Sequence, residues 1–134
     1  MKKTFLIATF MVFTISLAFS QSFFKVVKVN SLEYNSYTEK WDIIKTNEPE
    51  NMMVIINGAK IKVTDNANSA YMTYKQTEKK THTDHITSSW SAYDEKGRDC
   101  SVIMNSYFGY KRFFLTILYL SSDLGYEYIV EPQD

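Results

Sequence analysis

The stretch Met52–Val63 reads MMVIINGAKIKV and predicts two short strands, Met52–Ile56 and Ala59–Val63, joined by a tight turn. Asn57 and Gly58 are the turn signal, because an Asn-Gly pair adopts the positive φ angles that a two-residue β-hairpin needs. After the turn, Ala59–Val63 alternates apolar and lysine residues, so that one face of the strand is apolar and the other is solvated. The stretch therefore predicts an antiparallel hairpin with one buried face.

Alternation with a period of two recurs in the rest of the chain and indicates further half-buried strands. Groups of Asp, Asn, Gly and Ser separate the alternating runs, as in turns between strands. The inward positions are predicted to be Ala70, Met72 and Tyr74, then Ile86, Ser88, Trp90 and Ala92, then Cys100, Val102 and Met104, and last Tyr126, Tyr128 and Val130. Turns are expected at residues 65–68, 94–97 and 121–125.

With Phe23–Val29 and Trp41–Lys45 added, the runs make eight or nine short strands at hairpin spacing. We therefore expect an all-β fold, an antiparallel meander of eight to nine strands. It is either barrel-like, of the calycin-like kind, or a two-sheet sandwich, because both architectures follow the same alternation. No connection is long enough for a crossover helix, which excludes a parallel α/β fold.

Residues 1–20 have the pattern of a secretory signal peptide. Two lysines precede an uncharged apolar run, and the small residues Ala18 and Ser20 occupy the −3 and −1 positions before Gln21. The apolar run is shorter than the roughly 20 residues that a transmembrane helix requires. The sequence therefore predicts export through a cleaved signal peptide, to the periplasm or the medium, and a single β domain at residues 21–134.

Charge and cysteine content limit the partners of the chain. Lys and Arg number 15 and Asp and Glu number 15, so the formal net charge is zero. Nucleic acids and anionic membrane surfaces attract basic proteins, and we expect neither as a partner. No second long apolar segment follows the signal peptide, so no membrane association is expected after cleavage. The one cysteine, Cys100, excludes an intrachain disulfide and is predicted to be buried on an apolar strand face.

The sequence contains no Gly-x-Ser-x-Gly elbow, phosphate-binding glycine loop, Cys-x-x-Cys pair or His-Glu-x-x-His helix, so we expect a non-enzymatic protein without a cofactor. The weak candidates for a metal site are His82, Asp84 and His85, whose side chains suit zinc. In an extended strand, however, His82 and His85 point to opposite faces, and they converge only if a turn bends the chain there. The polar surroundings favour a solvated loop over a metal site.

Aromatic residues are the feature of the sequence most suggestive of a function. Aromatic side chains on the apolar faces of strands have two interpretations. Either they line a cavity for an apolar or ring-bearing ligand, or they fill an ordinary core. The candidate ligand-binding residues are Trp41, Tyr74, Trp90, Tyr126 and Tyr128.

The strand Phe113–Leu120 departs from simple alternation, because apolar residues occupy both of its faces. A strand of this kind is usually covered on both sides. Either the segment before Trp41 covers its outer face, or another molecule does.

The chain contains three aromatic patterns: Tyr34-x-x-Tyr37-x-x-x-Trp41, Trp90-x-Ala92-Tyr93-Asp94-x-x-Gly97-x-x-Cys100 and Tyr126-x-Tyr128. With these patterns the chain resembles small exported single-domain β proteins of unknown function from Gram-negative bacteria. The resemblance implies no activity and no catalytic residues. A lipocalin-like barrel is a fold analogy only, since the lipocalin Gly-x-Trp signature is absent at Trp41.

The function expected from these observations is that of an exported, non-enzymatic binding module for a small apolar or aromatic ligand. The alternative is a protein–protein interaction or surface-structural protein that uses the apolar strand 113–120 or a free sheet edge. An aromatic interior serves the first function, and an uncovered apolar strand or edge serves the second.

Overall fold

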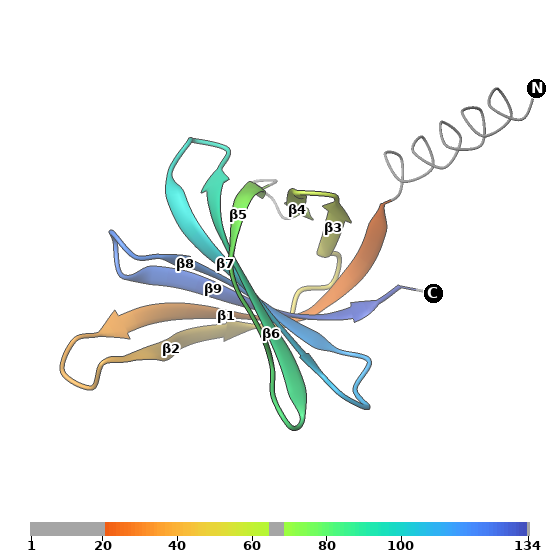
Figure 1. Cartoon of the computed structure of the whole chain (residues 1–134), viewed down its shortest axis with the longest axis horizontal. Coiled ribbons are helices and arrows are strands. Elements are labelled where there is room, and N and C mark those ends of the chain that lie inside the picture. Colours follow the sequence, from red (N-terminus) through yellow and green to blue (C-terminus); the bar gives the residue numbers. More distant parts are fainter. Residues whose placement is uncertain (1–20, 65–68, 134) are drawn as a thin grey trace, which may run out of the picture.

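The computed structural model describes residues 21–64 and 69–133, and this part of the chain forms nine β-strands (Figure 1). The predicted signal peptide, residues 1–20, and the predicted turn at 65–68 lie outside the described residues. None of the described residues forms a helix that could cross a membrane. The strands are β1 (Ser22–Asn35), β2 (Lys40–Asn47), β3 (Met53–Asn57), β4 (Lys60–Thr64), β5 (Ser69–Thr81), β6 (His85–Asp94), β7 (Asp99–Tyr107), β8 (Phe113–Tyr119) and β9 (Leu124–Pro132).

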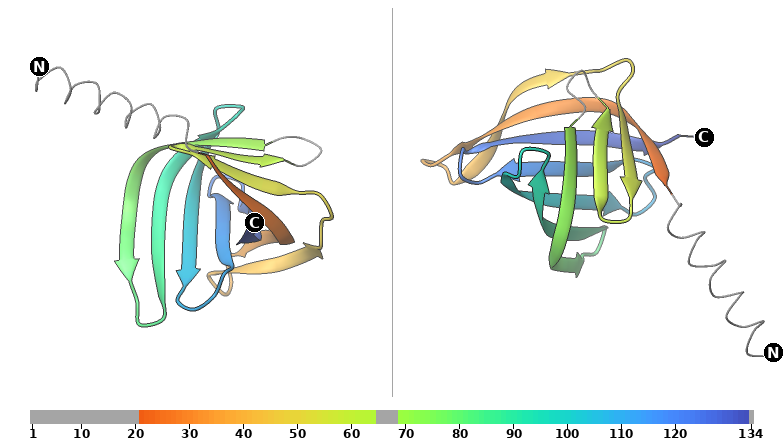
Figure 2. Two further views of the ribbon diagram at one scale, coloured as in Figure 1. Left: turned by 90° about the vertical axis from the view of Figure 1, so that its right-hand side faces the viewer. Right: turned by 90° about the horizontal axis from the view of Figure 1, so that it is seen from above.

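Antiparallel pairing joins all nine strands into one sheet that closes on itself. From β3 to β9 each strand pairs with the next one in sequence. The long strand β1 pairs with β3 near its start, with β2 near its end, and with β9 along its other edge. The pairing of β1 with β9 closes an eight-stranded barrel, and β2 extends the sheet beyond it (Figure 2). The expected meander is confirmed, and the architecture is a barrel rather than a sandwich.

The β3–β4 hairpin confirms the predicted turn and places it one residue later. Asn57 pairs with Lys60, so that Gly58 and Ala59 form the two-residue loop. Gly58 has a φ angle of 58° and occupies the first loop position, where hairpins of type II′ take glycine. The tight turn therefore depends on the glycine of the Asn-Gly pair, while the asparagine ends the strand.

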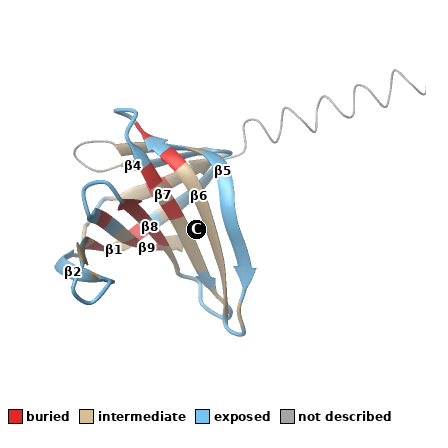
Figure 3. Cartoon of the chain, turned by 60° about the vertical axis from the view of Figure 1, so that its left-hand side comes forward, coloured by how far each residue is buried: buried red, intermediate tan, exposed pale blue. Residues whose placement is uncertain are grey.

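Inward side chains from the barrel strands form a single hydrophobic core. The inward faces predicted for the strands now labelled β4, β6, β7 and β9 are confirmed, and Cys100 is buried as expected. Buried positions recur along neighbouring strands of the barrel wall (Figure 3). The largest side chains that are fully buried are aliphatic: Val26, Val54, Val63, Val102, Leu115, Ile117 and Val130. They fill the middle of the barrel.

The inward face predicted for β5 is wrong. Tyr71 is the buried residue of this strand, while Met72 and Tyr74 are 48% and 54% exposed. Tyr71 pairs with the buried Asp94 of β6, which fixes the inward face one residue away from the predicted one. Because all three residues are large and partly apolar, alternation alone does not distinguish the two faces of this strand.

The outer face of the apolar strand β8 is buried at Leu118, where this side chain packs over Gly125 of β9. Leu118 points outward and is only 9% exposed, and it pairs with Gly125 of β9, which in turn pairs with Leu32 of β1. Leu32 is also buried, although it lies on the same outward face. The strand before Trp41 therefore lies in the sheet beside β9 rather than across β8. Leu120, just after β8, is 65% exposed.

Gly125 is required by close packing, which leads to a prediction. A Cβ atom at this position would lie 2.7 Å from the carbonyl oxygen of Ile117 and 2.8 Å from Cδ2 of Leu118. We expect Gly125→Ala to lower the free energy of unfolding by about 2 kcal/mol, as overpacking in a core does. Urea denaturation measures this change.

The control is Gly109→Ala, which places its Cβ in open space at a φ angle of 81°. Backbone strain alone costs about 1 kcal/mol at such a position. Equal losses in the two variants would contradict the packing role of Gly125.

Candidate functional site

A group of partly buried apolar side chains lies at the end of the barrel where β1 and β8 begin and β3 and β7 finish. All of them pack against the fully buried core and keep part of their surface exposed. The rings of Phe24 and Phe113 meet edge to face, with their centroids 4.9 Å apart. We call this group the open-end cluster; it consists of Phe24, Ile56, Trp90, Met104 and Phe113.

The open-end cluster stays partly exposed because the barrel wall beside it is incomplete. β4 pairs with β5 only over Ser69–Met72, and the last bond between them joins the amide of Thr73 to the carbonyl of Ala59. Beyond this point β5 pairs with β6 alone among the described residues, and its side chains are exposed from Tyr74 to Thr81. Trp90 of β6 projects inward at this level, opposite Gln76. The short β3–β4 hairpin therefore determines which interior side chains meet solvent.

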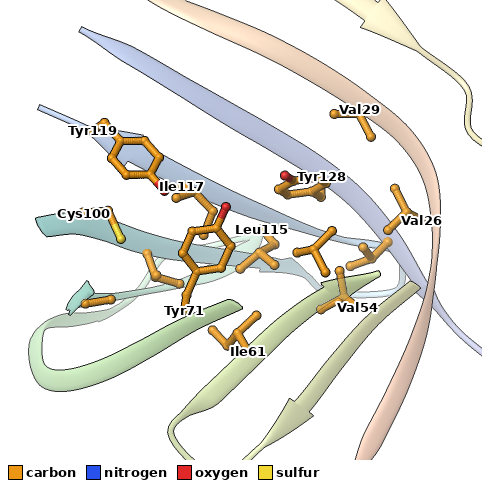
Figure 4. Close-up of a cluster of buried hydrophobic side chains, with 14 residues drawn as sticks. Val26, Val29, Val54, Ile61, Tyr71, Cys100, Leu115, Ile117, Tyr119 and Tyr128 are labelled. Atoms are coloured by element: carbon orange, nitrogen blue, oxygen red, sulfur yellow. The ribbon is translucent and has the colours of Figure 1, made fainter. Parts of the chain in front are cut away.

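The opposite part of the interior is polar and fully hydrogen-bonded. Tyr71 is hydrogen-bonded to Tyr119 and Tyr128, and the three rings lie among the aliphatic core side chains (Figure 4). The hydroxyl of Tyr119 donates to Oδ2 of Asp94 at 2.9 Å. The same carboxylate oxygen accepts a bond from Nε of Arg98 at 2.7 Å, and the guanidinium lies 5.0 Å from the centre of the Tyr119 ring. This network holds the end of the barrel where β6 turns into β7.

The network keeps Asp94 charged and its tyrosines neutral. Burial alone would raise the pKa of Asp94, but hydrogen bonds from Arg98, from the Tyr119 hydroxyl and from the Lys96 amide outweigh it, and the pKa lies below its usual value. Burial raises the pKa of Tyr71 to about 12. Burial and the nearby Tyr71 and Asp94 raise the pKa of Tyr119 as well. Both hydroxyls therefore stay protonated at neutral pH and act as donors.

Cys100 is an unsuitable nucleophile in this setting. Its side chain is buried in the core, and burial together with the negative charges of Asp94 and Asp99 raises the pKa of the thiol to about 11. A thiol needs its thiolate form to react, so Cys100 acts here as a small core residue.

The five predicted ligand-binding residues do not form one site. Trp90 belongs to the open-end cluster, and Tyr128 is buried in the tyrosine network at 3% exposure. Tyr126 is 40% exposed and lies next to Tyr128 in β9, at a ring-centroid distance of 6.3 Å. Trp41 packs against Tyr34 on the β1–β2 hairpin, outside the closed ring of strands. Tyr74 lies on the outer surface, because the inward face of β5 was predicted wrongly.

His82 and His85 do come together, through the turn between β5 and β6. Their rings are stacked with centroids 4.1 Å apart, and the ring of His85 also stacks on Tyr107. Nδ1 of His85 is hydrogen-bonded to Oδ1 of Asp84 at 2.6 Å. Parallel stacked rings do not direct their nitrogens at a common point, and the described residues contain no group of three His, Cys, Asp or Glu side chains suited to a metal ion.

Sequence reasoning identified one of the five open-end residues, Trp90. Phe24 and Phe113 lay in segments predicted to be strands, and Met104 lay on a face predicted to be inward. Their positions at the ends of strands would have marked them as candidates for the rim of a barrel. Which strand ends share one end of the barrel depends on the pairing of β1 with β3 and with β9, and no local pattern indicates those pairings.

The described residues define a closed antiparallel β-barrel with a filled middle, a polar network towards one end and an apolar cluster towards the other. Comparisons of the chain with protein-family models, with curated proteins and with solved structures find no match. The site is therefore interpreted from its own geometry.

Asp94 generates a prediction on pH dependence. Its pKa is lower in the folded state than the value of about 4 in an unfolded chain, so it stabilises the fold above pH 4 and loses this contribution as the pH falls below 4. We expect Asp94→Asn to destabilise the protein at pH 7 and the difference from the unaltered protein to shrink at pH 3. Urea denaturation at the two pH values measures both.

The control is Asp123→Asn, at an exposed turn position with a φ angle of 55° that asparagine tolerates. Its effect should be small at both pH values. An Asp94→Asn effect that is the same at pH 7 and pH 3 would show that the charge of this residue does not contribute.

Proposed function

We propose that the protein is an exported, non-enzymatic binding module for a small apolar or aromatic ligand, and that the ligand binds at the open-end cluster. The observation that carries the proposal is the partial exposure of five large apolar side chains at one end of an otherwise filled barrel. Apolar surface of this kind gains free energy on leaving water, at roughly 25 cal/mol per Å². A rigid barrel holds the side chains in place before binding, which reduces the entropy lost on association.

The chemistry of the open-end cluster favours apolar ligands. Two phenyl rings, an indole, a thioether and an aliphatic chain offer flat and adaptable surfaces without charge. Trp90 adds one hydrogen-bond donor, which suits a ligand with a polar group at one end. No nucleophile or general base belongs to the cluster, so the site supports binding rather than catalysis.

The filled core decides how deep such a ligand binds. Leu115, Ile117 and Val102 are completely buried below the cluster and occupy the middle of the barrel. A ligand therefore rests on the cluster, between the start of β8 and the exposed part of β5, instead of entering the barrel as in a hollow calycin. This position predicts a compact ligand and moderate affinity.

The proposal is tested with N-phenyl-1-naphthylamine as an apolar fluorescent probe. Trp41→Phe leaves Trp90 as the single tryptophan, since the chain has two. We expect the probe to quench Trp90 emission saturably in this variant, because energy transfer requires the two rings to be close. The single variant Met104→Ala, with both tryptophans in place, should bind the probe several-fold more weakly, because it lacks one side of the contact surface.

Tyr37→Ala is the matched control, because this residue is 97% exposed on the β1–β2 turn, away from the cluster. Its probe affinity should equal that of the unaltered protein. Absence of saturable quenching, or equal losses in Met104→Ala and Tyr37→Ala, would refute binding at the open-end cluster.

A second candidate function is association through the free edge of β2. Among the described residues β2 pairs only with β1, and Ile43 and Ile44 are each 57% exposed on it. An uncapped edge strand with apolar side chains accepts another strand by backbone hydrogen bonding. This second candidate is the alternative expected from the sequence, an interaction protein that uses a free sheet edge.

Sedimentation velocity over a hundredfold range of concentration distinguishes the two functions. If β2 mediates self-association, the sedimentation coefficient rises with concentration, and Ile43→Lys abolishes the rise because a lysine at an edge opposes strand addition. A constant monomer coefficient would exclude self-association through β2. Ile43→Lys should leave probe binding at the open-end cluster unchanged.

A further inference from the structure

A cleft of about 320 Å³ lies on the outer surface of the barrel, over β5, β6, β7 and the turn after β8. Its lining includes Ser91 and Ser101, which pair with each other across β6 and β7 and are half-buried. Small side chains on two neighbouring strands leave a depression wherever larger residues flank them. The residues that line this outer cleft are Tyr74, Ser91, Asp99, Cys100, Ser101, Leu120 and Ser121.

Tyr74 forms an aromatic wall of the outer cleft. One face of its ring stacks on Tyr93, with centroids 4.6 Å apart and an angle of 21° between the planes. Tyr74 is 54% exposed and lines the cleft, whereas Tyr93 does not. The stack therefore holds the Tyr74 ring in a fixed orientation while leaving it accessible from the cleft.

The other lining groups are neutral hydroxyls and one carboxylate. Ser91, Ser101 and Ser121 each offer a donor and an acceptor, and Asp99 is an exposed acceptor at the start of β7. Leu120, 65% exposed, adds an aliphatic surface. No cationic side chain lines the cleft, which argues against a phosphate or carboxylate ligand.

We propose that the outer cleft binds a pyranose ring of an oligosaccharide, with the C–H face of the sugar against Tyr74 and its hydroxyls bonded to Ser91, Ser101 and Asp99. A pyranose combines a flat apolar face with a periphery of donors and acceptors, which is the combination that a fixed ring and surrounding hydroxyls complement. The volume lies at the small end of the range of about 300–1,000 Å³ for small-molecule sites. The outer cleft and the inward-facing open-end cluster are separate, and neither proposal depends on the other.

Isothermal titration calorimetry with cellotetraose, maltotetraose and chitotetraose tests the proposal. We expect at least one of them to bind the unaltered protein, and Tyr74→Ala to weaken that binding about tenfold, the effect of losing one favourable ring contact and its burial. Tyr74→Phe keeps the ring and should retain most of the affinity. Ser101→Leu should abolish binding by filling the floor of the cleft.

Tyr110→Ala is the matched control, since this tyrosine is 75% exposed and does not line the cleft. Its affinity for the bound sugar should be unchanged. The proposal is overturned if none of the three tetrasaccharides binds, or if Tyr74→Ala, shown to be folded by circular dichroism, binds as the unaltered protein does. A cleft that binds only indole, added as a flat aromatic probe, would likewise overturn it.

Discussion

The pairing of β1 with β9 is the constraint on which the rest of the structure depends. It joins strands from the two ends of the described chain, from Phe24 opposite Pro132 to Glu33 opposite Leu124. Without it the strands would form an open sheet with β9 as an exposed edge, and their apolar faces would have no common interior. With it, valines and leucines from opposite walls meet in a filled core. A closed barrel also has a defined inside and two ends, so that the two ends can acquire different chemistry.

Differences in strand length determine which end of the barrel exposes interior side chains to solvent. The short β3–β4 hairpin covers β5 only as far as Thr73, and interior apolar side chains meet solvent where the cover stops. At the other end, Asp94 and Tyr119 close the interior with a hydrogen bond between them, and no buried polar side-chain atom of the described residues lacks a partner. One end of the barrel therefore leaves apolar surface partly exposed, and the other carries a paired polar network.

Two features of the outer surface arise from the pairing of neighbouring strands, β8 with β9 and β6 with β7. Gly125 lets Leu118 pack closely over β9, which buries an apolar residue on a face that would otherwise be solvated. On the neighbouring strands, Ser91 and Ser101 leave a depression beside the Tyr74–Tyr93 stack. Both features arise where a small residue stands next to a large one on paired strands. The outer cleft and the covered strand are therefore opposite results of one principle, the complementarity of side-chain size across a sheet.

The sequence by itself determined the strands, most of the turns, the all-β class and the inward faces of β4, β6, β7 and β9, because these depend on alternation and on local turn residues. It identified Trp90 as a candidate site residue for the same reason. It did not determine the inward face of β5, since large, partly apolar residues occupy both faces and only the pairing of Tyr71 with Asp94 distinguishes them. Nor did it determine the choice of barrel over sandwich, or which of the aromatic residues lie together. Those depend on contacts between residues far apart in the chain, above all on the closure of β1 against β9, and alternation within a strand carries no information about which distant strand it meets.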